Sequence, residues 1–138
     1  MPACKKSDPA PDPATVLQGK NWKMTALTVS PAYNGLTDVF NEIYDPCDQD
    51  DLYKFNAGNI FAWDNAVTKC DATDPQTIPG TWSYNNATKI LRITFNPVQG
   101  SYDMLYLLKE VNDNSFKGEV MIPENGIDYT YTTTFQKQ

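Results

Sequence analysis

The chain has 138 residues, with 17 Asp and Glu against 11 Lys and Arg, no His and a net charge of −6. This balance argues against nucleic-acid binding, which needs a basic stripe that displaces the counterions of phosphates. Apolar residues make up 41% and charged residues 20% of the chain, which favours a single folded domain over a disordered chain. No apolar run approaches the roughly 18 residues of a membrane-spanning helix.

Residues 1–15 are predicted to be a disordered tether. Cys4 follows Ala3 and precedes Lys5 and Lys6, a pattern typical of a bacterial lipoprotein whose signal sequence has been removed. We therefore expect lipidation at Cys4 of an exported protein, anchored to the outer membrane on its periplasmic or cell-surface side, with the lipid as its only membrane contact. The alternative is an ordinary thiol in a frayed terminus. The prolines that follow predict an extended, semi-rigid spacer.

From residue 16 to 138 we expect one all-β domain, because strand-length segments alternate with turn residues. The last segment shows the clearest alternation, with Tyr129, Tyr131 and Phe135 on one face and threonines on the other. One short helix is expected near 36–44, where apolar residues recur at helical spacing, and we expect it to cover the apolar outer face of 102–111. The eight predicted strands are 21–29, 51–56, 60–63, 80–84, 89–95, 102–111, 115–121 and 127–136.

Eight consecutive strands joined by tight hairpins favour an eight-stranded antiparallel up-and-down β-barrel, since closure removes the two unpaired sheet edges. The alternative is a two-sheet sandwich, which needs longer crossover connections than these turns provide. A barrel of this size is filled by side chains or holds one small ligand.

Four segments follow one another in a characteristic order: Leu17 to Trp22, the Asp-rich stretch at Cys47 that leads into Tyr53 to Gly58, Cys70 to Thr77, and Gly80 to Ser83. In this order they resemble the lipocalin-like domains of secreted lipoproteins of the Bacteroides group, which look like members of the calycin class of barrels. The resemblance implies a barrel that binds a small, mostly apolar ligand, although Gly19 and Trp22 are one residue further apart than the Gly-x-Trp motif of true lipocalins.

Cys47 and Cys70 form an even pair in an exported domain, so a disulfide with a structural role is predicted. The chain has no His to complete a zinc site, and no metal site is predicted. The aspartates near both cysteines could bind Ca²⁺ if their loops converge, but no EF-hand pattern is present, and the other interpretation is a solvated acidic rim.

The ligand hypothesis rests on the large number of aromatic residues. Because Tyr offers a polar hydroxyl on an apolar ring, an interior rich in Tyr favours an amphipathic guest over a pure hydrocarbon. The alternative is that these side chains simply fill the core. The predicted ligand-binding residues are Tyr53, Phe55, Leu91, Ile93, Tyr129 and Tyr131.

The expected function is therefore that of a lipid-anchored cell-envelope protein, monomeric and without a cofactor, that binds a small amphipathic molecule in its barrel. The alternative is a filled barrel that acts as a protein-interaction or inhibitor-like surface domain. Catalysis is not expected, because the sequence has no His, no nucleophile elbow, no phosphate-binding loop and no recognisable carboxylate pair.

Overall fold

The computed structural model describes residues 12–96 and 101–138. Cys4 and most of the predicted tether thus lie outside the described residues. The elements in chain order are α1 (Pro13–Leu17), β1 (Asn21–Tyr33), β2 (Leu36–Asp38), α2 (Phe40–Ile43), β3 (Leu52–Asn56), η1 (Ala57–Asn59), β4 (Ile60–Asp64), β5 (Thr77–Asn85), β6 (Ile90–Phe95), β7 (Tyr102–Lys109), β8 (Ser115–Glu124) and β9 (Ile127–Lys137).

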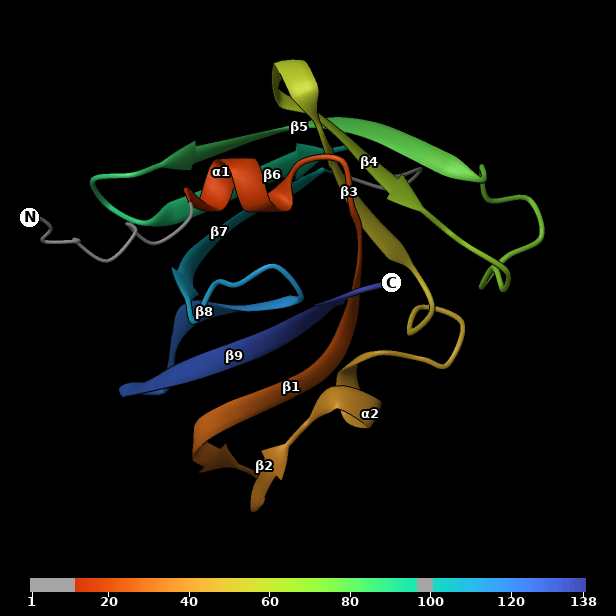
Figure 1. Cartoon of the computed structure of the whole chain (residues 1–138). Helices are drawn as coiled ribbons and strands as arrows, with labels where there is room; N and C mark the ends of the chain where they lie inside the picture. Colours follow the sequence, from red (N-terminus) through yellow and green to blue (C-terminus); the bar gives the residue numbers. More distant parts are fainter. Residues whose placement is uncertain (1–11, 97–100) are drawn as a thin grey trace, which may run out of the picture.

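Eight of these strands form the predicted closed antiparallel barrel, and the short β2 is added beside β1. Each strand from β3 to β9 pairs with the next, and β1 closes the barrel by pairing with both β3 and β9 (Figure 1). The closure confirms the barrel prediction over the two-sheet sandwich.

The ladders between neighbouring strands of the barrel differ in length. The β1–β9 ladder contains eight residue pairs, whereas β1–β3 and β7–β8 each contain three. Beyond the pair Leu107 and Glu119, β7 and β8 no longer pair, and beyond the pair Lys23 and Leu52 the same holds for β1 and β3. The sheet therefore divides into a β3–β7 half and a β1, β8 and β9 half, which pair at one end and separate toward the other.

The end where the halves pair is closed by α1. Asp12 caps this helix by accepting a hydrogen bond from the Ala14 amide, and Pro13 follows at the first helical position, where its missing N–H costs nothing. Leu17 and Trp22 are fully buried, and the Trp22 indole donates a 3.0 Å hydrogen bond to the Leu17 carbonyl. The ordered domain thus begins before residue 16, because residues 13–15 belong to α1.

The region between β1 and β3 differs from its prediction. The turn at Asn34 and Gly35 has positive φ at both residues and forms a hairpin, so that Leu36 starts β2 instead of a helix. The predicted helix over 36–44 is confirmed only as α2. Phe40 and Tyr44 pack inward near β1, so α2 does not cover the outer face of β7, where Leu105 is 54% exposed.

Candidate functional site

Four of the six predicted ligand-binding residues lie in the packed core. Tyr53, Phe55, Leu91 and Ile93 are at most 2% exposed and belong to one apolar cluster. Phe61 fills the space beside the two aromatic members, with ring centroids 6.0 Å from Tyr53 and 5.4 Å from Phe55. At this level the interior is occupied by the protein's own side chains, as the alternative interpretation of the aromatics expects.

The other two predicted residues, Tyr129 and Tyr131, lie at the end of the barrel away from α1. They pack against a second apolar cluster formed by Leu27, Val29 and Val39. The structure therefore does not bring the six predicted residues together; it divides them between a filled core and the region where the two halves of the sheet separate.

A groove of about 380 Å³ lies at this second region, between the β2–α2 segment and the β8–β9 hairpin. In Figure 1, β2 and α2 are at the end of β1 that is remote from α1. Three of the groove's apolar side chains, Leu36, Ile43 and Ile122, are 43–51% exposed. The lining residues are Tyr33, Asn34, Leu36, Val39, Glu42, Ile43, Ile122, Glu124 and Tyr131.

Glu124 is the polar group of the groove with a fixed position. The Tyr33 hydroxyl lies 3.1 Å from each of its carboxylate oxygens and donates its hydrogen to this carboxylate. The hydrogen bond to Glu124 raises the pKa of Tyr33, because it stabilises the neutral phenol beside a negative charge. The Tyr33 ring packs edge to face on Tyr129 with centroids 5.2 Å apart. Sequence alternation gives no indication of this pair, because its members are 91 residues apart.

Asp51 is a polar residue inside the barrel that the sequence interpretation placed on an acidic rim. It is 2% exposed, and neither of its carboxylate oxygens has a hydrogen-bond partner within the described residues. Burial is the main cause that raises the pKa of Asp51 to about 7, and the nearby Asp48 raises it further, whereas the Trp63 indole lowers this pKa. The sequence feature that could have indicated this burial is the position of Asp51 two residues before Tyr53, because residues two apart in an extended chain face the same side.

Tyrosine hydroxyls share this part of the interior. The hydroxyls of Tyr102 and Tyr106 are 3.2 Å apart, and burial raises the pKa of both side chains. Burial also raises the pKa of Tyr44 to about 12, with smaller contributions from Tyr102 and Asp48. These phenols remain neutral at physiological pH, so they act as hydrogen-bonding groups and not as bases.

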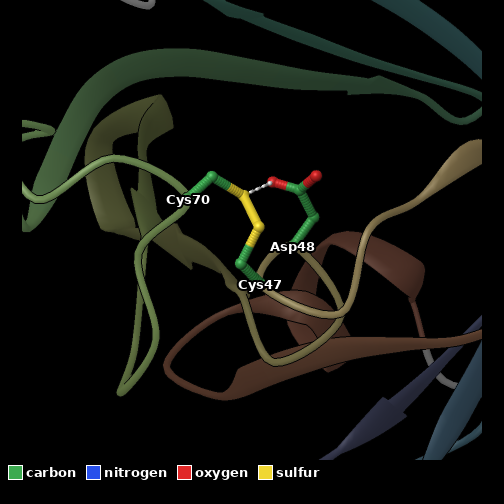
Figure 2. A group of neighbouring side chains, drawn as sticks. All are labelled: Cys47, Asp48 and Cys70. Atoms are coloured by element: carbon green, nitrogen blue, oxygen red, sulfur yellow. Dashed lines mark hydrogen bonds between the residues drawn. A yellow bond between two sulfur atoms is a disulfide. The ribbon is translucent and has the colours of Figure 1, made fainter.

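The predicted disulfide between Cys47 and Cys70 is confirmed (Figure 2). It joins the loop before β3 to the loop after β4, with the two Cα atoms 5.1 Å apart. An Asp48 oxygen lies 3.2 Å from Cys70 Sγ, and because a disulfide sulfur carries no hydrogen this is a close contact without a donor. The two sulfurs and Asp48 are within 4.8 Å of one another, but the disulfide removes the thiolates that a zinc ion would need.

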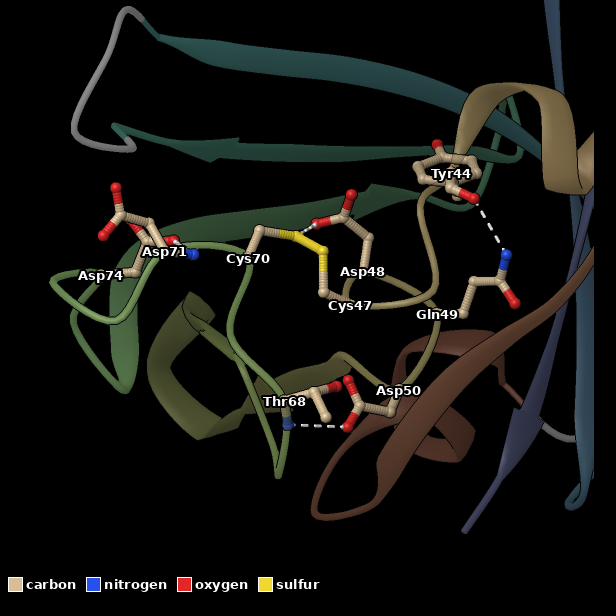
Figure 3. Close-up of a disulfide and its surroundings, with 9 residues drawn as sticks. All are labelled: Tyr44, Cys47, Asp48, Gln49, Asp50, Thr68, Cys70, Asp71 and Asp74. Carbon is tan, nitrogen blue, oxygen red and sulfur yellow. Dashed lines mark hydrogen bonds between the residues drawn. A yellow bond between two sulfur atoms is a disulfide. The ribbon is translucent and has the colours of Figure 1, made fainter.

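The acidic side chains around the disulfide do not converge on one point. Figure 3 shows Asp48 directed toward Cys70, whereas Asp50 is directed toward Thr68, whose amide donates a 3.0 Å hydrogen bond to Asp50. Asp71 accepts two hydrogen bonds from Thr73, and Asp74 accepts one from the Asp71 amide. Asp71 and Asp74 thus stabilise their own loop and Asp50 links the two loops, which favours the acidic rim over a calcium site.

A second groove, of about 470 Å³, lies on the outer surface where β7 and β8 no longer pair. Leu105 and Met121 are 54% and 63% exposed there, and the inward-facing Met104 and Val120 can be reached from outside. Asp103 lines this groove and forms an exposed ion pair with Arg92, with an N···O distance of 2.8 Å.

Sequence comparison matches the chain to no protein family and to no curated protein. Within residues 12–96 and 101–138, no helix has the length and apolar character required to cross a membrane.

Proposed function

We propose that this chain is a lipid-anchored cell-envelope protein of the lipocalin-like type, which binds a small amphipathic molecule at the open end of its barrel. The observation that carries the proposal is the apolar groove beside Tyr131, in which partly exposed Leu36, Ile43 and Ile122 surround a fixed carboxylate. A small molecule is recognised well by such a combination of apolar walls and one positioned polar group.

The proposed site differs from the cavity expected from sequence. The side chains of Tyr53, Phe55, Leu91 and Ile93 fill the barrel near α1, so the ligand lies at the mouth and contacts Tyr131. The packed core becomes the rigid support of the groove.

Native mass spectrometry of protein purified from its own host tests the proposal directly. A co-purified small molecule that is released by denaturation, and lost in Ile43→Ser, supports binding at the groove. Protein that carries no small molecule, and that binds no amphiphile added in solution, refutes it.

The lipid anchor has a separate test because Cys4 lies outside the described residues. Cells that express the full chain are labelled with a fatty-acid analogue. Label that disappears in Cys4→Ser supports acylation at this residue, whereas label that is unchanged by the substitution refutes it.

A second candidate function is protein contact through the outer β7–β8 groove. Exposed Leu105 and Met121 favour it, since contiguous apolar surface on an exported domain often marks an interface. Crosslinking in the host envelope that is lost in Leu105→Ser but retained in Ile43→Ser would favour this function over ligand binding.

A further inference from the structure

The segments that line the mouth groove carry acidic but no basic side chains. Residues 24–53 and 118–136, which supply all nine lining side chains, contain no Lys and no Arg. The same two segments contain nine acidic residues, and Glu42 and Glu124 line the groove itself. A ligand that enters the groove therefore meets the carboxylates of Glu42 and Glu124, and opposite charge is the complementary choice.

The Glu124 carboxylate is held so that it can accept a further hydrogen bond. Tyr33 provides one donor to a group that has about four lone-pair positions. Among the described residues, no basic side chain lines the groove to neutralise Glu124 or Glu42. A cationic head group would supply the missing charge, and the ring of Tyr33 or Tyr131 offers it an aromatic contact as well.

We infer that the ligand of this groove is a cationic amphiphile. The ammonium head lies against Glu124 and Glu42, and the apolar chain lies along Leu36, Ile43 and Ile122. A fatty acid or another anionic amphiphile is disfavoured, because its head would lie beside two like charges. The inference rests on the proposed function and deepens it by naming the chemical class of the ligand.

Calorimetric titration with three probes of one chain length separates the head group from the chain. The probes are dodecyltrimethylammonium, dodecyl maltoside and dodecyl sulfate, each below its micellar concentration and at low ionic strength. We expect the cationic probe to bind most tightly, the uncharged probe more weakly, and the anionic probe not at all. Methyl NMR should place the bound probe near Ile43 and Ile122, with Ile60 unchanged as an exposed reference far from the groove.

Substitutions then test the two carboxylates. Glu124→Gln should weaken binding of the cationic probe about threefold to tenfold and leave the uncharged probe unchanged. Asp128→Asn is the matched control, because this exposed acid lies on the same hairpin but does not line the groove. Ile43→Ser should weaken the cationic and the uncharged probe alike, whereas Ile60→Ser should weaken neither.

The outcomes distinguish the two proposals. Equal affinity for all three probes, lowered by Ile43→Ser but not by Glu124→Gln, overturns the cationic class and leaves the binding function in place. An equal effect of Asp128→Asn and Glu124→Gln shows attraction by net charge alone and overturns the placement of the head group against Glu124. Absence of binding for every probe overturns both.

Discussion

The buried carboxyl of Asp51 predicts an unusual dependence of stability on pH. The folded protein raises the pKa of this group from 3.8 to about 7. Between about pH 4 and pH 7 the folded state therefore holds a proton that the unfolded chain has released, so that raising the pH in this range lowers stability. Below about pH 4 both states are protonated and the effect vanishes, while above about pH 8 the full penalty is present.

Asp51→Asn removes this penalty because the amide cannot ionise. A pKa unit corresponds to about 1.4 kcal/mol, so the shift amounts to about 4 kcal/mol for a fully dehydrated charge. Partial hydration of the charged carboxylate lowers this value, and we expect about 2–4 kcal/mol. Urea unfolding at pH 4, 6 and 8 should show the variant close to the natural protein at pH 4 and more stable at pH 8.

Asp64 provides a control of opposite sign. Hydrogen bonding to Lys54 lowers the pKa of Asp64 to about 2, so its charged form stabilises the fold. Asp64→Asn should destabilise the protein at neutral pH, and this loss should diminish as the pH falls toward 2.

A stability difference between Asp51→Asn and the natural protein that is the same at every pH would refute the assigned burial of the Asp51 charge.

Three further predictions concern the scaffold. Replacing Cys47 and Cys70 with Ala removes a cross-link across a sequence separation of 23 residues, which should lower the free energy of unfolding in urea by about 3 kcal/mol and lower Tm by roughly 10 °C. Unchanged stability would show that the disulfide does not contribute to the stability of the fold. Trp22→Phe leaves the Leu17 carbonyl without its donor in the core and should cost about 2–3 kcal/mol, whereas a loss below about 0.5 kcal/mol would contradict a tight closure by α1. In Gly118→Ala the new Cβ would lie 2.7 Å from a tyrosine ring of β7, so chemical denaturation should show a loss of about 1–3 kcal/mol, and a stabilised variant would refute that contact.

The sequence predicted the strands well because alternation and turn residues are local signals. All eight predicted strands are present. The strand β2 was missed because the prediction for this region rested on the helical spacing of residues 36–44, whereas Asn34 and Gly35 form a hairpin turn.

The candidate site was predicted only in part, for a different reason. Alternation shows which face a side chain occupies, but not how deep it lies along the barrel axis. Tyr53 and Tyr131 both face inward, yet one is in the packed core and the other at the mouth. Depth depends on where β7 and β8 stop pairing, and that register joins residues far apart in sequence. The Tyr33 and Glu124 pair was missed on the same grounds.

The uneven ladders of β1 also determine when the barrel can close during folding. The strand that is made first has its longest ladder, eight pairs, with the strand that is made last. Its pairs with β2 and β3 can form earlier, but the opposite edge of β1 stays unpaired until β9 is made. Such distant pairing makes folding slow. Barrel closure therefore follows the synthesis of β9, and until then the open β1 edge is the part that most needs protection from aggregation.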